Sequence, residues 1–154
     1  MHSKFLNIEN DEIKLEAVLW YNCNKTEANP QMSIYYNIIR KIDNVVIGNC
    51  GIRLANNEEN HYLGNIEYEV FEQYQGNNYA YKATKLLGQV ALNLNVDELS
   101  ITASPDNIAS IKTIEKLGAK FIRIQKVPRK FKLHKNSKKV AIYNWQLESE
   151  RIKW

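Results

Sequence analysis

The chain has 154 residues, of which 44% are hydrophobic and 25% are charged, a composition typical of a globular domain and unlike that of disordered or fibrous proteins. No apolar run is long enough to span a bilayer, and the first residues lack the apolar stretch of a signal peptide, so we expect a cytoplasmic protein with no membrane partner. The spacing of Cys23 and Cys50 fits neither a disulfide framework nor a zinc site, so we expect two thiols and no metal. We expect one domain over residues 1–154.

Charge is distributed unevenly along the chain. Residues 1–72 contain six Lys or Arg and eleven Asp or Glu. Residues 73–154 contain fifteen Lys or Arg and six Asp or Glu. Nine basic residues and no acidic residue lie between positions 120 and 139. Such a run can attract nucleic acid or an anionic ligand, but it has no regular aromatic interleave and no reading-helix motif. We therefore favour a solvated hairpin or loop for this segment.

The first half of the chain predicts strands. The pattern at residues 12–21 is ambiguous between strand and helix, and we favour a strand. Residues 32–40 and 45–54 are rich in Ile, Val and Tyr, and Asp43-Asn44 between them indicates a hairpin. Residues 61–71 alternate like a further strand. Residues 22–31, with Pro30, are predicted as a connection and residues 56–60 as a polar loop.

The pattern changes after Gly76. Apolar residues from Tyr79 to Leu94 recur at three- and four-residue spacings, which predicts a helix with one buried stripe. A short strand at 99–103 is followed by helix-start residues at 104–107 and by a second helix that ends at Gly118. Strands at 121–127 and 140–147 flank the basic segment. This order predicts an α/β domain with a mixed sheet.

The junction at residues 70–80 is the most informative stretch. A strand that leads through a short, polar, glycine-bearing turn directly into a helix leaves backbone N–H groups at the positive end of the helix. Such a junction is an anion site suited to a pyrophosphate. One glycine in a strand-to-helix turn is common, so the junction alone is a weak signal.

Two motifs resemble one family. Tyr74-Gln75-Gly76-Asn77-Asn78-Tyr79-Ala80 is similar to the acyl-CoA pyrophosphate loop of the GNAT acetyltransferase superfamily, with Asn78 where that family usually has glycine. Residues 107–119, which begin Asn-Ile-Ala-Ser and end Lys-Leu-Gly-Ala, resemble the next strand-helix unit of the same family. The serine at position 110 makes this version most similar to the ribosomal-protein alanine acetyltransferase branch. Taken without the resemblance, Asn107 is a helix cap and Ser110 a first-turn residue.

The resemblance implies a fold, a cofactor and a reaction. The fold is a mixed central sheet flanked by helices, with the usual first two helices short or missing, because residues 22–31 are too few for them. The reaction is transfer of an acetyl group from acetyl-CoA to a primary amine, on a small molecule or a protein N-terminus, by direct attack in a ternary complex. The implied cofactor-binding residues are Val70, Phe71, Gln75, Gly76, Asn77, Asn78, Tyr79, Ala80, Tyr81, Asn107 and Ser110.

The catalytic residues are less plain. Many relatives use a tyrosine as the general acid seven residues after the helix-start asparagine, but that position is Ile114. We therefore predict Ser110 as the residue that helps the sulfur leave, with Tyr68 as the second candidate. The expected strand parity places the two neighbours of Tyr68, which are glutamates, on the opposite face, and His61 is expected on the surface. The general base is left open.

Two other functions remain open from the sequence. A non-catalytic acyl-CoA-binding module is supported by Asn78, Ile114 and the missing base. A basic nucleic-acid-binding protein, which we consider unlikely, is supported by residues 120–139 alone. Because the first helices are short or missing, a second subunit could close the acceptor site, so a homodimer is also considered.

Overall fold

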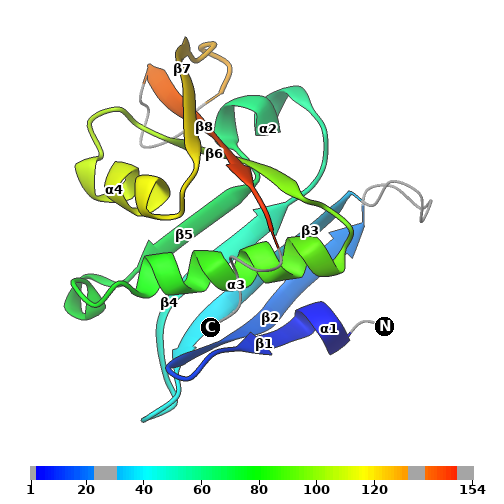
Figure 1. The fold of residues 1–154 in the computed structure, drawn as a ribbon, viewed down its shortest axis with the longest axis vertical. Helices are drawn as coiled ribbons and strands as arrows, with labels where there is room; N and C mark the ends of the chain where they lie inside the picture. The colour runs from blue at the N-terminus through cyan, green and yellow to red at the C-terminus, as the bar shows by residue number, and fades with distance from the viewer. Residues whose placement is uncertain (1–2, 23–30, 132–137, 149–154) are drawn as a thin grey trace.

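The computed structural model describes residues 3–22, 31–131 and 138–148, and Figure 1 shows the course of the chain. The elements in chain order are α1 (Ser3–Leu6), β1 (Asn7–Glu9), β2 (Ile13–Asn22), β3 (Met32–Arg40), β4 (Val45–Arg53), α2 (Glu58–Leu63), β5 (Ile66–Val70), the 3-10 turn η1 (Glu72–Tyr74), α3 (Tyr79–Asn93), β6 (Glu98–Ala103), α4 (Ile108–Lys116), β7 (Lys120–Lys126) and β8 (Lys139–Gln146).

The strands form two sheets that meet between β5 and β6. The first sheet has the order β1-β2-β3-β4-β5 and the second the order β6-β8-β7, and all recorded pairs within them are antiparallel. Figure 1 shows β5 and β6 running in the same direction and diverging after their first residues. A mixed α/β fold with helices against a central sheet, as predicted, is therefore confirmed, with the parallel neighbours at the join of the two sheets.

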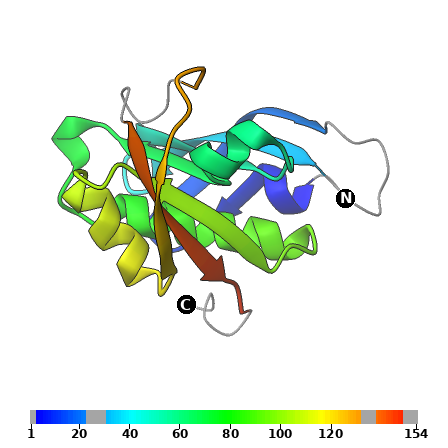
Figure 2. The ribbon, with the colours of Figure 1, turned by 90° about the horizontal axis from the view of Figure 1, so that it is seen from above.

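The core lies between α3 and the five-stranded sheet. Figure 2 shows α3 (green) along one side of strands β2 to β4. Its stripe Leu86, Leu87 and Val90 is fully buried, and it packs against a face of the sheet that includes Leu15 and Ile38, which are paired across β2 and β3. The period of 3.6 in the helix and of 2 in the strands places these residues on facing surfaces. Burial of this apolar surface is the main stabilising contribution to the fold.

Most predicted elements are confirmed within a residue or two. The strand at 12–21, the hairpin at 32–54, the long helix after Gly76 and the four later elements all appear at the predicted places. Asn44, in the predicted turn, has a positive φ of 58°, which asparagine tolerates better than most residues. The connection at 22–31 lies almost wholly outside the described residues, and so does Cys23.

Two predictions in the middle of the chain are wrong. Residues 56–60 are not all loop, and residues 61–71 are not one strand, because residues 58–63 form helix α2 and the strand begins only at Ile66. Asn57 caps this helix by accepting a hydrogen bond from the Asn60 amide at 2.8 Å, and Gly64 ends it with a φ of 82°. Local capping therefore overrides the alternation of the sequence. The short elements α1, β1 and η1 were also not predicted.

The remaining expectations concern the cysteines, membrane spans, the number of domains and the location of the protein. Cys50 is a buried free thiol, as expected, and burial raises its pKa, which makes the thiol unreactive. Within the described residues, no helix is long and apolar enough to cross a membrane. The single domain over residues 1–154 and the cytoplasmic location stay predictions.

Candidate active site

The site begins where the two sheets separate. At the start of β5, the Asn65 amide donates to the Ser100 carbonyl of β6 at 2.7 Å, and the Asn65 side-chain oxygen accepts from the Ser100 amide at 2.7 Å. Thr102 of β6 donates to the carbonyls of Tyr62 and Leu63 at 3.1 and 2.9 Å, which attaches the end of α2 to this strand. The strands are thus fixed together at one end and diverge toward η1 and α4.

The backbone of β5 faces the gap at alternate residues. The Arg53 amide donates to the Asn65 carbonyl, and the Phe71 amide donates to the Ile47 carbonyl. Because antiparallel pairing alternates, the odd-numbered residues of β5 bond to β4, and the amides and carbonyls of Tyr68 and Val70 point away from it. These two predicted residues therefore offer backbone groups to the gap between β5 and β6.

Tyr68 and Ser110 are brought together across 42 positions of sequence. The Tyr68 hydroxyl lies 2.7 Å from the Ser110 Oγ, and either oxygen can be the donor. Tyr68 projects from β5, whereas Ser110 lies in the first turn of α4. Burial raises the pKa of Tyr68, although the hydrogen bond with Ser110 acts to lower it. The pair is therefore protonated at neutral pH and can donate one further hydrogen bond.

Asn107 acts as the cap of α4. Its side-chain oxygen accepts from the Ser110 amide at 3.1 Å, which is the arrangement of an N-cap. This bond leaves the two N–H donors of the Asn107 side-chain amide for another acceptor. Capping also fixes the first turn of α4, and with it the position of Ser110.

The predicted pyrophosphate loop lies between η1 and α3. Gly76 has a φ of 90° and Asn78 a φ of 60°, so both residues are left-handed. A Cβ built on Gly76 would meet nothing within 4 Å, which leaves open space beside the loop. Asn78 therefore adopts a left-handed conformation at the position where the sequence departs from the family pattern, and asparagine is among the residues that tolerate this conformation.

The amides at the start of α3 are available to an anion. The first amide that donates within the helix is that of Lys82, to the Asn78 carbonyl at 3.0 Å. The amides of Tyr79, Ala80 and Tyr81 precede it and have no intrahelical acceptor. The Asn78 side chain makes no capping hydrogen bond to them. The positive end of a helix of 15 residues therefore faces outward here.

The predicted loop side chains serve mainly to shape the loop. Gln75 donates from Nε2 to the Val70 carbonyl at 2.9 Å, and Asn77 donates from Nδ2 to the Tyr74 carbonyl at 3.2 Å. Phe71 begins the 3-10 turn in an extended conformation. The Arg40 guanidinium, which the sequence did not single out, stacks over the Tyr74 ring at 5.0 Å from its centroid. The loop is thus held from within and from the β3–β4 hairpin.

None of the side chains weighed as a base lies free beside the hydroxyl pair. Glu67 and Glu69 are exposed, on the parity opposite Tyr68, as predicted. Glu67 bonds through Oε2 to Arg53 Nη1 at 2.6 Å, a partner that the sequence did not indicate. His61 is exposed on α2, and its Nε2 lies 3.5 Å from an Arg123 nitrogen. Ile114, in the position of the acid used by relatives, is fully buried.

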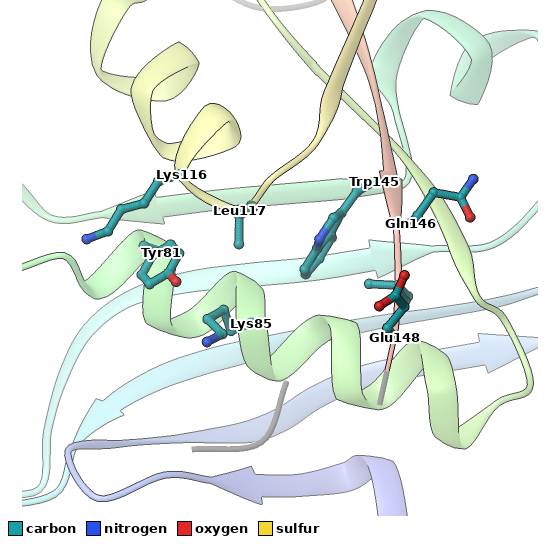
Figure 3. Close-up of a pocket in the computed structure, with 8 residues that line it drawn as sticks. Tyr81, Lys85, Lys116, Leu117, Trp145, Gln146 and Glu148 are labelled. Atoms are coloured by element: carbon teal, nitrogen blue, oxygen red, sulfur yellow. The ribbon is translucent and has the colours of Figure 1, made fainter. Parts of the chain in front are cut away.

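A separate pocket of about 200 Å³ lies between α3, the end of α4 and β8. Figure 3 shows Tyr81 and Lys85 on α3 below Lys116 at the end of α4, with Trp145 on β8 beside them. The Lys116 ammonium lies 4.4 Å and the Lys85 ammonium 5.5 Å from the centroid of the Tyr81 ring. Tyr81 is the one predicted site residue in its lining.

The chain matches one family over most of its length. Residues 6–120 match the profile of the acetyltransferase (GNAT) domain. The chain therefore belongs to the GNAT acetyltransferase family, and the predicted superfamily and enzyme class, an acyl-CoA-dependent N-acetyltransferase, are confirmed. The predicted cofactor, acetyl-CoA, agrees with this class. No curated protein matches the chain in sequence.

Solved structures share the fold at low sequence identity. The ribosomal-protein-S5-alanine acetyltransferase from Vibrio fischeri aligns with a TM-score of 0.67 and 10% identity, over 93% of this chain and 97% of its own. RimJ from Mycobacterium smegmatis, in complex with CoA-disulfide, aligns with a TM-score of 0.61 and 15% identity, over 79% of this chain and 56% of its own. The microcin C7 self-immunity acetyltransferase MccE, in complex with acetyl-CoA and AMP, aligns with a TM-score of 0.59 and 19% identity, over 75% of this chain and 61% of its own. At sequence identities this low, the similarity to these structures shows a shared fold and nothing about substrates.

Proposed function

We propose that the chain transfers an acetyl group from acetyl-CoA to a primary amine, on a small molecule or a protein N-terminus, by direct attack in a ternary complex. The observation that carries the proposal is that one strand, β5, which borders the gap between the two sheets, leads to both the hydroxyl pair and the predicted pyrophosphate loop. β5 bears Tyr68, hydrogen-bonded to Ser110, and leads after Val70 into the predicted pyrophosphate loop. If the loop held the pyrophosphate of acetyl-CoA and β5 held its pantetheine arm, the thioester would reach the hydroxyl pair.

The loop and the start of α3 would hold the pyrophosphate. The residues from Gly76 to Tyr81 offer amides at the positive end of α3. The left-handed Gly76 and Asn78 turn the backbone toward that space without a side chain at Gly76. We assign Gln75 and Asn77 to shaping the loop rather than to contacting phosphate, because both side chains bond to the backbone of the loop region.

The backbone of β5 and the cap of α4 would hold the arm of the cofactor. Tyr68 directs its amide and carbonyl and Val70 its amide into the gap, so an extended amide chain can pair with them as a strand would. Phe71 turns the chain away from the gap into η1. Asn107 can donate its side-chain N–H groups to a carbonyl of the arm while its oxygen continues to cap α4.

The hydroxyl pair would supply the proton for the leaving sulfur. Acetyl-CoA supplies the acyl group as a thioester, whose C–S bond breaks as the amine nitrogen forms the amide bond. Ser110 Oγ donates its proton toward the sulfur, and the Tyr68 hydroxyl donates to Ser110 in turn. The raised pKa of Tyr68 keeps this second proton in place at neutral pH. The proton that the amine loses passes to water, which then restores Tyr68.

The pocket beside Tyr81 would receive the nucleotide end of the cofactor. It lies on the same helix as the loop, and Lys85 and Lys116 flank the Tyr81 ring with two positive charges. An aromatic ring and two ammonium groups suit a base and a phosphate. Because only Tyr81 of this pocket also contributes a loop amide, the assignment can be tested separately from that of the loop.

One observation favours a second candidate, an acyl-CoA-binding module without turnover. Ile114 offers no hydroxyl that could act as the acid, and the carboxylate of Glu67, one of the side chains weighed as a base, is bound to Arg53. Such a module would bind CoA at the same loop. It would release no thiol when an amine is added.

Thiol release with a panel of amines distinguishes the two functions. The panel holds spermidine, aminoglycosides, amino acids and short peptides, each mixed with acetyl-CoA and the chain. We expect amine-dependent thiol release with at least one class, and a higher melting temperature with CoA alone, because a ligand that binds the native state stabilises it. A melting shift without thiol release from any amine would favour the binding module, and the absence of both would contradict the proposal.

A further inference from the structure

Strand β7 is the outer strand of the second sheet. In the order β6-β8-β7 it pairs with β8 alone, and among the described residues no strand lies along its other side. The pairing shifts once, between Phe121 and Arg123, where Ile122 has no partner on β8. Figure 1 shows β7 and β1 at opposite ends of the molecule. Because antiparallel pairing uses the backbone groups of alternate residues, the other backbone groups of β7 are open to a further strand.

One face of β7 is mainly apolar. Phe121 and Ile124 lie opposite Tyr143 and Ala141 of β8, and the two β7 residues are exposed by 55% and 48%. The Phe121 ring meets the Tyr143 ring edge-on, with 5.5 Å between the ring centroids. Lys126, at the end of the strand, has the same parity as Ile124. A further strand beside β7 would therefore find two uncovered apolar side chains on this face.

The other face of β7 is cationic. The register with β8 places Lys120 and Arg123 on this face, and both are exposed. Arg123 donates from Nε to Gln125 Oε1 at 3.0 Å, so this partner is uncharged. Within the described residues no ion pair includes a basic residue of β7, and positions 120–139 contain no acidic residue. The charge of this face therefore calls for an acidic partner, and the proposed function does not use it.

We propose that β7 binds an extended peptide segment of a partner protein in which apolar and acidic side chains alternate. Successive side chains of a strand point to opposite faces of a sheet. A segment paired with β7 would thus place its apolar side chains beside Phe121 and Ile124, and its carboxylates beside Lys120 and Arg123. Backbone hydrogen bonds would supply part of the affinity, and the two faces would supply the selectivity.

Charge and side-chain type disfavour two other occupants of this edge. A second β7 would bring like charges together, and residues 17–22 of β2, which β1 does not cover, hold no charged side chain. Single-stranded nucleic acid binds by stacking successive bases on aromatic side chains. β7 has one aromatic side chain, Phe121, among its seven residues. An acidic and apolar peptide therefore fits this edge better than a second copy or a nucleic acid.

The inference does not depend on the proposed reaction. β6 borders the gap next to β5, whereas β7 is separated from β6 by β8. Binding at β7 can therefore be measured in the absence of acetyl-CoA. A single added strand buries less surface than a permanent interface, so we expect weak, reversible binding. Since charge contributes to it, added salt should weaken it.

Fluorescence anisotropy of a labelled peptide, titrated with the full chain, tests the inference. The probe is an eight-residue peptide that alternates valine and glutamate and has blocked ends. One control peptide holds the same residues in two blocks. The other is the alternating peptide with N-methyl groups on two consecutive central residues, which removes an amide from each of its edges. We expect the probe to bind at least about tenfold more tightly than either control.

Reversal of charge on the cationic face should reverse the choice of peptide. Arg123→Glu should weaken binding of the valine–glutamate probe by about tenfold. Lys112→Glu is the matched control and should leave it unchanged, because Lys112 is exposed on α4 and does not belong to β7. The double variant Lys120→Glu/Arg123→Glu should bind an alternating valine–lysine peptide more tightly than the wild-type chain does. The melting temperature of each variant checks that it folds.

Four results would overturn the inference. No binding of the probe would remove the site. Equal binding of the probe and the two control peptides, or equal binding by Arg123→Glu and Lys112→Glu, would mean that no strand pairs with this edge. Tighter binding of a labelled oligothymidine with the same number of negative charges would identify a nucleic-acid site instead. Self-association that the probe does not reduce and that Arg123→Glu abolishes would show a second copy on β7.

Discussion

The loop at residues 75–81 and the hydroxyl pair Tyr68–Ser110 form two parts of one proposed site by different physical means. The loop would bind the pyrophosphate through backbone amides, and this proposed function depends on the left-handed conformation of Gly76 and Asn78. The pair is made of side chains from β5 and α4, joined at 2.7 Å. A local sequence pattern can specify the first, whereas only the folded chain brings the second together.

This difference separates binding from chemistry. A change of backbone conformation in the loop should act on CoA affinity, because it displaces the amides that would meet the phosphates. Removal of a hydroxyl should act on turnover, because its hydrogen bond strengthens only as charge develops on sulfur. Variants in the two parts should therefore affect different kinetic constants.

The largest expected effect is that of Gly76→Val on CoA affinity. Gly76 has a φ of 90°, where a β-branched residue is strained by roughly 1–3 kcal/mol, and the new side chain would enter the open space beside the loop. We expect the dissociation constant of CoA, measured by titration calorimetry, to rise about a hundredfold. Gln73→Ala, at an exposed position before the loop, is the control and should change it little. Equal effects of the two variants would mean that the loop is only a turn.

Ser110→Ala should lower turnover and spare affinity. Loss of a hydrogen bond to a developing charge, worth roughly 1.5–3 kcal/mol, should reduce kcat by about ten- to a hundredfold while the CoA dissociation constant stays nearly unchanged. Asn107→Asp is the contrasting variant, because it keeps the oxygen that caps α4 at Ser110 but loses the N–H donors, and loss of a contact made equally before and during the reaction should raise the Michaelis constant. Unchanged kcat in Ser110→Ala would reduce this serine to a first-turn residue of α4.

Tyr68→Phe should have a smaller effect that depends on Ser110. A neutral hydrogen bond contributes about 0.5–1.5 kcal/mol, so we expect kcat to fall about two- to tenfold. If Tyr68 acts through Ser110, the double variant should turn over no more slowly than Ser110→Ala alone. Additive losses, measured in a double-mutant cycle, would show that the two hydroxyls act separately.

Asn78→Gly should have the smallest effect. Asn78 already has a φ of 60°, so glycine would relieve little strain in the folded chain and would add freedom to the unfolded one. We expect the free energy of unfolding to change by less than about 1 kcal/mol and CoA affinity by about twofold. A gain in affinity of a hundredfold would show instead that asparagine impairs the loop.

The sequence predicted well those elements whose signals are local and agree. The helix after Gly76 has a regular apolar stripe, and α4 begins at Asn107, the cap that was predicted. The segment at 56–71 was misassigned because its signals conflict. The alternation of residues 66–70 extends by chance into residues that Asn57 and Gly64 delimit as a helix. Short helices depend on such caps more than on periodicity.

The site was predictable to the extent that its motifs are contiguous. The loop residues and Asn107 carry recognisable patterns, whereas the ion pair of Arg53 with Glu67 joins two neighbouring strands, a pairing that no spacing in the sequence indicates. The contact of Lys116 with Tyr81 likewise depends on how α4 meets α3. Ser110 and Tyr68 could be named as candidates, but their hydrogen bond could not be foreseen.

A crystal structure of the chain with CoA would test the central claim most directly. The account predicts that the pyrophosphate accepts hydrogen bonds from amides between Gly76 and Tyr81, and that the sulfur lies within hydrogen-bond distance of Ser110 Oγ. A pyrophosphate bound away from the start of α3, or a sulfur on the other face of β5 from Tyr68 and Ser110, would contradict it.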